Sequence, residues 1–221
     1  MRQLAEDFLL LAIGYGRLFK AAITGGDVCR ARVLLAEDLD DCGAHQSAYR
    51  RLCAVIAAKP TIARAYQARA MALLNLKRPR EALEDFSQAL ALQPEYPGAR
   101  RWRAHAHSKL GEHAAAAADY LQDLRGHPDG PHGRVMGISP LHWTDCAAAF
   151  ASAGDSAMAI GLLEEYFADH ASRVTAYRSD ETAPMRLLAR LYMQHGRVER
   201  AGELRQLALQ SPHRVPADEQ S

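Results

Sequence analysis

Hydrophobic residues recur along most of this chain at spacings of three and four, which is the pattern of amphipathic helices. The pattern is clearest from Ala63 to Pro94, where two such segments flank a short polar stretch. It predicts two helices joined by a tight turn, with the small residues Ala70 and Ala82 where the two backbones approach closely. The same pattern predicts further helices over residues 3–23, 28–40, 45–58, 141–153, 156–169, 184–195 and 198–210.

The central helix pair recurs along the chain with a period of 34 residues. The residues in register are Ala36, Ala70 and Ala104; Ala48, Ala82 and Ala116; Leu52, Phe86 and Tyr120; and Pro60, Pro94 and Pro128. A fixed period of this length indicates stacked helix pairs that share a continuous core.

The turns between paired helices share a glycine. Gly43, Gly111, Gly154 and Gly196 each precede the small residue of the following helix by five positions. Glycine suits the left-handed conformation that closes a helix. In the central pair Lys77 takes this place, and Pro79 opens the next helix.

The central segment resembles the tetratricopeptide repeat, on the residues Tyr66, Ala70, Ala82, Phe86, Ala89 and Pro94. The neighbouring segments depart from this pattern, since Asp123 stands where Ala89 would recur and Arg32 and Arg100 stand where Tyr66 would. The resemblance implies an all-α fold, a right-handed helical-repeat solenoid of about five helix pairs with an N-terminal helix. It also implies that the first helix of each pair lines a concave surface that binds another protein or a peptide.

The spacing of the pairs predicts the domain organisation. We expect an N-terminal capping helix (1–26), three repeats (27–128), an inserted loop (129–140), two further helix pairs (141–212, with a loop at 170–183) and a disordered tail (213–221). Insertions in repeat proteins often form binding loops, but they are also tolerated as surface excursions because each doubling of loop length costs only about 0.6 kcal/mol. Both interpretations stay open, as does the alternative that the first helix belongs to another pair.

Composition and charge exclude several function classes. The net charge of +1 favours neither nucleic acid nor a membrane as partner. The four cysteines form no CxxC motif, as expected of free thiols in a reducing compartment. The N-terminal apolar run, Phe8 to Ile13, is too short for a secretory signal or a membrane span, so we expect a cytoplasmic location. His105 and His107 are two residues apart and point to different faces of a helix, so we expect no metal and no cofactor.

The sequence predicts no enzyme, because it contains no phosphate-binding loop, nucleophile elbow or HExxH motif. The single candidate pair is Cys146 with His142, one helical turn apart. Alanines follow Cys146 on a face that is typical of packing, and a buried thiol is usually inert.

The exposed positions of the first helices predict a binding groove. Its predicted partner-binding residues are Arg64, Gln67, Met71, Asn75, Arg101, His105, Ser108, Lys109, Arg186 and Arg190. One period earlier the stripe holds Arg30, Val33, Glu37, Asp40 and Asp41, so the groove is expected to run from an acidic to a basic end. The alternative is an ordinary solvated face.

Trp102 and Trp143 both fall early in a first helix. Each could fill the space between helices or form an interface hot spot, and exposure would distinguish the two roles.

These patterns favour an adaptor, scaffold or chaperone-like protein that binds an extended peptide or a partner helix with an acidic segment. The alternatives are a regulator or immunity-type protein that inhibits one partner through the loops 129–140 and 170–183 and, less favoured, an accessory enzyme of a biosynthetic pathway. The chain is expected to be a monomer or a homodimer, with Val198, Leu204 and Leu207 as the candidate dimer surface.

Overall fold

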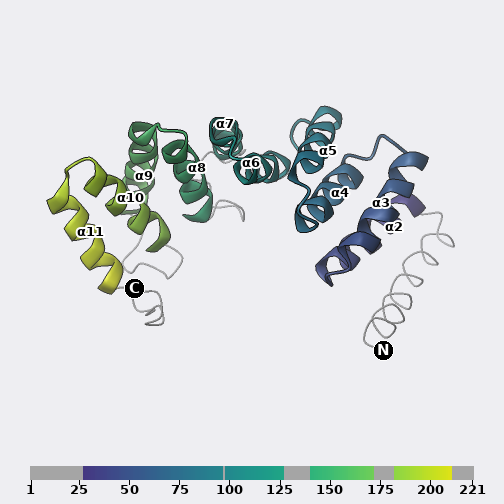
Figure 1. Ribbon diagram of the computed structural model, residues 1–221, viewed down its shortest axis with the longest axis horizontal. Helices are drawn as coiled ribbons and strands as arrows, with labels where there is room; N and C mark the ends of the chain where they lie inside the picture. Colours follow the sequence, from purple (N-terminus) through teal and green to yellow (C-terminus); the bar gives the residue numbers. More distant parts are fainter. Residues whose placement is uncertain (1–26, 97, 127–139, 172–181, 211–221) are drawn as a thin grey trace. The chain divides into compact units, whose positions relative to one another are not determined.

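The computed structural model describes residues 27–96, 98–126, 140–171 and 182–210. These residues form α-helices and no strand (Figure 1). The helices are α2 (Val28–Asp41), α3 (His45–Ala58), α4 (Ala63–Asn75), α5 (Pro79–Leu92), α6 (Ala99–Lys109), α7 (His113–Arg125), α8 (Pro140–Ser152), α9 (Ser156–Ala171), α10 (Thr182–Gln194) and α11 (Val198–Gln210). The predicted N-terminal helix, the tail and most of both inserted loops lie outside the described residues.

The chain divides into two compact units, residues 1–110 and 111–221. In the first unit α2 pairs with α3 and α4 pairs with α5, and α6 packs against α5. In the second unit α8 pairs with α9 and α10 pairs with α11, while α7 packs against α8. Each unit therefore contains two stacked helix pairs and one further helix, α6 in the first unit and α7 in the second.

The residues in 34-residue register form the core. The six alanines from Ala36 to Ala116 that mark the register are fully buried, as are Leu52 and Phe86. Alanine lets neighbouring helices approach closely, and the larger side chains fill the space between the pairs. The core of the second unit includes Leu163, Leu188 and Leu191.

The turn glycines adopt the left-handed conformation, with φ between 74° at Gly196 and 91° at Gly154. Lys77 adopts it too, with φ of 61°, and is the one non-glycine residue with positive φ among those described. The Arg78 amide donates to the Leu73 carbonyl at 2.9 Å, as the Ala44 amide does to Leu39 at 2.8 Å, so both turns close their helices in the same way.

Helix ends differ from the predicted ones by up to two residues. α10 begins at Thr182, because Pro184 is accommodated in its first turn, where no amide donor is needed. α9 continues to Ala171. None of the described helices has the length and apolar character needed to cross a membrane.

A bidentate ion pair joins α4 to α5. Arg69 donates from Nε and Nη2 to the two carboxylate oxygens of Asp85, each at 2.7 Å. Asp85 is buried, and the Arg69 guanidinium also lies 5.7 Å from the centre of the Tyr66 ring. Arg69 thus packs its charged group within the pair instead of presenting it to a ligand.

Candidate functional site

The first helices of the first unit, α2, α4 and α6, carry two adjoining hollows, which we call together the α2/α4/α6 groove. One, of about 210 Å³, is lined by Glu37, Asp40, Asp41, Gln67, Ala68, Met71 and Trp102. The other, of about 460 Å³, is lined by Met71, Leu74, Asn75, Lys77, Pro79, Trp102, His105 and Lys109. Met71 and Trp102 belong to both and separate an acidic hollow from a basic one.

The two tryptophans have different environments. Trp102 is 36% exposed, and its ring meets His105 edge to face with 5.9 Å between ring centroids. Trp143 is 1% exposed and packs against Tyr166 at 5.7 Å. Trp143 therefore belongs to the core of the second unit, whereas Trp102 presents a large aromatic surface to the groove.

Most charges of the acidic hollow are already paired. Arg64 donates from Nε and Nη2 to the two carboxylate oxygens of Glu37 at 2.8 and 2.7 Å, and this hydrogen bonding raises the pKa of the guanidinium. Asp40 accepts from Asn75 Nδ2 at 2.9 Å and lies 2.7 Å from His45 Nδ1. Asp41 is exposed and has no ion pair or hydrogen bond within the described part of the chain. It is the carboxylate that a ligand can reach without breaking an internal bond.

The basic hollow combines apolar walls with two ammonium groups. Met71, Leu74, Pro79 and Trp102 supply the apolar surface. Lys77 and Lys109 are exposed, and neither is paired with a carboxylate of the described residues. A ligand that fits here carries an apolar side chain and a negative charge.

The structure brings half of the predicted partner-binding residues together. Gln67, Met71, Asn75, His105 and Lys109 line the groove. Arg64 lies beside it, tied to Glu37, while Arg101 and Ser108 are half-buried on α6 and line neither hollow.

Two positions of the predicted exposed stripe are buried instead. Val33 is fully buried in the core formed with Leu52 and Ala65, because α2 packs against both α3 and α4 and that face has no access to solvent. Asp40 is 9% exposed for the same reason.

Sequence reasoning missed Lys77, Leu74 and Pro79 and left Trp102 undecided. The one available signal was the lysine at a turn position that elsewhere holds glycine.

The second unit holds the remaining predicted residues. Arg186 and Arg190 are exposed on α10, four residues apart and hence on one face of the helix.

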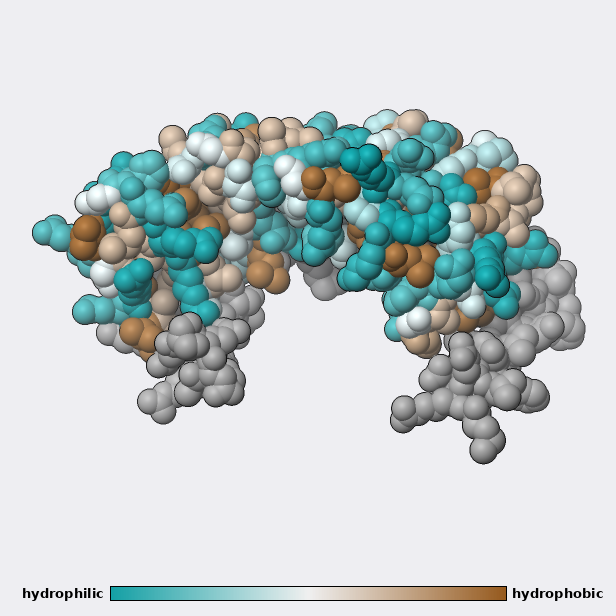
Figure 2. Space-filling model, viewed as in Figure 1, coloured by the Kyte–Doolittle hydropathy of each residue, from teal (hydrophilic) through white to brown (hydrophobic). Residues whose placement is uncertain are grey.

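Hydrophobic surface on the face shown in Figure 2 occurs as separate areas bounded by hydrophilic side chains.

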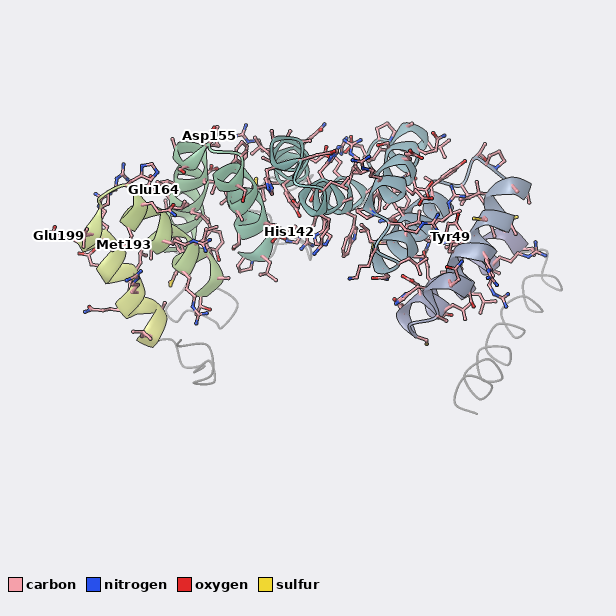
Figure 3. All side chains as sticks on the ribbon, in the orientation of Figure 1. Tyr49, His142, Asp155, Glu164, Met193 and Glu199 are labelled. Carbon is pink, nitrogen blue, oxygen red and sulfur yellow. The ribbon has the colours of Figure 1, made fainter. Side chains whose placement is uncertain are left out.

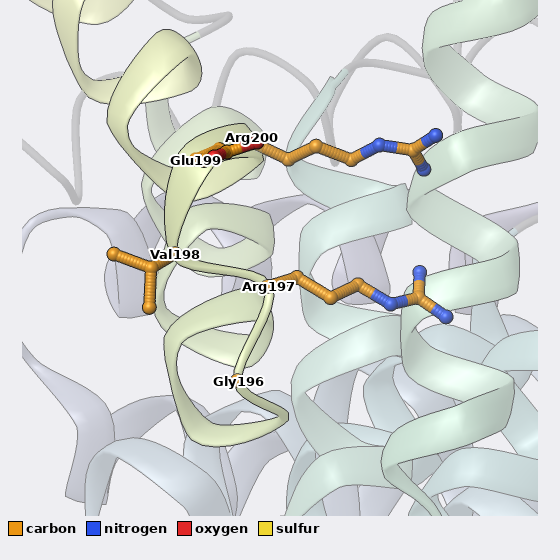
Figure 4. A pocket seen from close by; sticks show the side chains of 5 residues that line it. All are labelled: Gly196, Arg197, Val198, Glu199 and Arg200. Carbon is orange, nitrogen blue, oxygen red and sulfur yellow. The ribbon is translucent and has the colours of Figure 1, made fainter.

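A hollow of about 570 Å³ also lies at the turn between α10 and α11. Figure 4 shows Arg197 and Arg200 extending side by side to one side of this turn and Val198 to the other. Arg197 Nη1 donates to Glu164 Oε1 at 3.3 Å, and Tyr192 donates to the same oxygen at 2.6 Å. Glu164, labelled on α9 in Figure 3, therefore offsets the positive charge of the turn.

The candidate catalytic pair does not suit nucleophilic chemistry. Cys146 is fully buried, and burial raises the pKa of its thiol to about 12, with a smaller opposing effect from Arg125. The thiol is therefore protonated at neutral pH and has little nucleophilic thiolate. His142 lies in the first turn of α8 (Figure 3). Among the described residues no group of three or more His, Cys, Asp or Glu side chains could hold a metal ion.

Comparison with known families matches residues 63–96, which are α4, α5 and the segment after them, to the tetratricopeptide repeat. These residues are a tetratricopeptide repeat. The helix pair that carries most of the groove lining is thus the pair that the family pattern recognises.

Solved repeat structures share the fold. The TPR-like repeats of a kinesin light chain from Podosopora anserina are 21% identical, with a TM-score of 0.69 over 81% of this chain and 92% of that one. YrrB, described as a TPR protein with an unusual peptide-binding site, is 13% identical, with a TM-score of 0.67 over 87% of this chain and 90% of that one. MamA from Desulfovibrio magneticus RS-1 is 14% identical with a TM-score of 0.68, covering 83% and 94% of the two chains. The predicted fold class, an all-α helical-repeat solenoid, is confirmed.

A curated relative matches a shorter stretch. The DnaJ homolog subfamily C member 7 homolog of Schizosaccharomyces pombe is 38% identical over 86 residues, which are 37% of this chain and 18% of that protein. The chain therefore spans about a fifth of the length of this relative.

Proposed function

We propose that this chain is a protein-binding module of adaptor, scaffold or chaperone-like type and not an enzyme. Its α2/α4/α6 groove binds an extended peptide or a helix of a partner protein. The observation that carries the proposal is the position of Trp102. This residue belongs to α6, and its ring is partly exposed between the two hollows. Aromatic side chains in such positions contribute a large share of binding energy, because partner side chains bury against them.

Three further observations support this function. YrrB, with the same fold, is described by its peptide-binding site. The relative from Schizosaccharomyces pombe is a DnaJ homolog, which favours a chaperone-like role. Cys146, in the one candidate catalytic pair, has a buried and protonated thiol.

We further propose that a long partner extends beyond the groove. Its acidic part then lies toward Arg101 and Ser108 of the first unit and toward Arg186 and Arg190 of the second. In this proposal the array comprises about five helix pairs, with residues 1–26 as an N-terminal cap.

The test is a binding measurement with peptides selected from a random library against the wild-type protein. Trp102→Ala is expected to weaken binding of the selected peptides by about tenfold or more, since hot-spot truncation typically costs over 1.4 kcal/mol. The matched control is Leu92→Ala, which removes an apolar side chain of nearly equal exposure (37%) from α5 that lines neither hollow. Equal affinities of wild type and Trp102→Ala would contradict the proposal.

The regulator alternative predicts the reverse pattern. Arg134 and Tyr177, in the two inserted loops, lie outside the described residues. If these loops bind the partner, alanine at both positions weakens binding while Trp102→Ala does not.

A further inference from the structure

The turn between α4 and α5 departs from the other described turns of its kind. The other turns have a glycine at the position with positive φ, namely Gly43, Gly111, Gly154 and Gly196. In the α4–α5 turn this position is Lys77, which has a φ of 61° although it carries a side chain. An L-residue in this conformation is disfavoured because its Cβ crowds the following carbonyl. Departures of this kind from local preference are expected mainly at functional sites.

Lys77 does not stabilise the fold through a charge pair, since its ammonium group has no ion pair or hydrogen bond among the described residues, and only its backbone amide donates, to the Leu74 carbonyl at 3.0 Å. Its side chain lines the basic hollow together with Lys109, which comes from the C-terminal end of α6. Two unpaired ammonium groups, one from the turn between α4 and α5 and one from α6, therefore line one hollow, whose remaining walls are largely apolar.

The opposite hollow has the opposite charge. Glu37 accepts hydrogen bonds from Arg64, and Asp40 is bonded to His45 and Asn75. The exposed Asp41 can therefore pair with a ligand. Met71 and Trp102 lie between the two charges because both residues line both hollows. The groove thus offers negative charge, apolar surface and positive charge in sequence.

Building on the proposed function, we propose that the groove selects a charge-polarised peptide segment. A large apolar side chain packs against Met71 and Trp102, Asp or Glu side chains lie beside Lys77 and Lys109, and a Lys or Arg side chain lies beside Asp41. Complementary charge on both sides of an apolar anchor fixes the direction in which the segment lies and disfavours segments of reversed polarity.

The experiment is a selection of random peptides displayed with the C-terminus fused to the carrier, so that acidic side chains are the source of carboxylate. Wild type is compared with Lys77→Gln/Lys109→Gln. The matched control is Arg50→Gln/Arg51→Gln, which removes two exposed positive charges from α3, outside the groove. Circular dichroism confirms that all three proteins are folded.

Wild type and control are expected to enrich peptides with acidic residues on one side of a large apolar residue and a basic residue on the other. The lysine variant keeps the apolar preference and loses the acidic one. A synthetic, amidated form of the most enriched peptide should bind the lysine variant about tenfold more weakly, as expected for two partly exposed ion pairs. Asp41→Asn should reduce the preference for the basic residue alone.

The outcomes separate this inference from the function on which it rests. The proposal of a charge-polarised segment is wrong if the enriched peptides show no preference for acidic residues. It is also wrong if the synthetic peptide binds wild type and the Lys77→Gln/Lys109→Gln variant with equal affinity. If Trp102→Ala still abolishes binding in that case, the groove remains a peptide site. The absence of any enriched peptide overturns both proposals.

Discussion

At the scale of single residues, Lys77 combines a disfavoured backbone conformation with a place in the groove. Replacing it by glycine should relieve the crowding of its Cβ and raise the free energy of unfolding by about 0.5 to 1 kcal/mol, measured by denaturant titration. The same change should weaken binding of acidic peptides. Gly43→Ala, at φ of 84°, is the opposite control and should lower stability by a similar amount. A destabilised Lys77→Gly protein would show that the lysine supports the fold and not the site.

Cys146 gives a second prediction at this scale. Its pKa is raised from 9.0 to about 12, so the folded state holds the thiol proton more tightly than the unfolded state does. The resulting stability is present in full below pH 9 and is lost as the pH rises from 9 toward 12. Cys146→Ala should therefore lose less stability over that range than wild type.

With a thiol reagent at pH 8, the exposed Cys42 should react before Cys146.

At the scale of helices, the ion pair of Arg69 with Asp85 joins α4 to α5 behind the groove. Asp85→Ala removes the carboxylate and leaves a guanidinium that is only 22% exposed, so we expect a loss of about 2 to 4 kcal/mol in the free energy of unfolding. Glu81→Ala, in the exposed pair with Arg78, should leave the denaturation midpoint nearly unchanged. If Asp85→Ala lowers the free energy of unfolding as little as Glu81→Ala does, the contact between α4 and α5 depends on packing alone.

The helices also show how far the sequence predicts this fold and site. The 34-residue register of alanines was sufficient to predict the core, because a small residue at a close helix crossing leaves a periodic signal in the sequence. Exposure of a given side chain depends on which neighbouring helix covers it, and that leaves no local signal. Val33, which the pattern places on the exposed stripe, is fully buried because two helices cover it. The sequence predicted the stripe of charged residues but not the ion pairs within it, such as that of Arg64 with Glu37.

At the scale of the whole molecule, a partner's length should decide which unit it contacts. Both hollows of the groove are lined by residues of the first unit, whereas Arg186 and Arg190 belong to the second. Arg186→Gln/Arg190→Gln should therefore leave the affinity of a short selected peptide unchanged. The same variant should weaken binding of a full-length partner several-fold, because a longer acidic segment loses two charge contacts. Arg205→Gln, an exposed change on α11, is the control. Loss of short-peptide affinity in the double variant would mean that both units contribute to one site, and the groove would then have to be redefined to include α10.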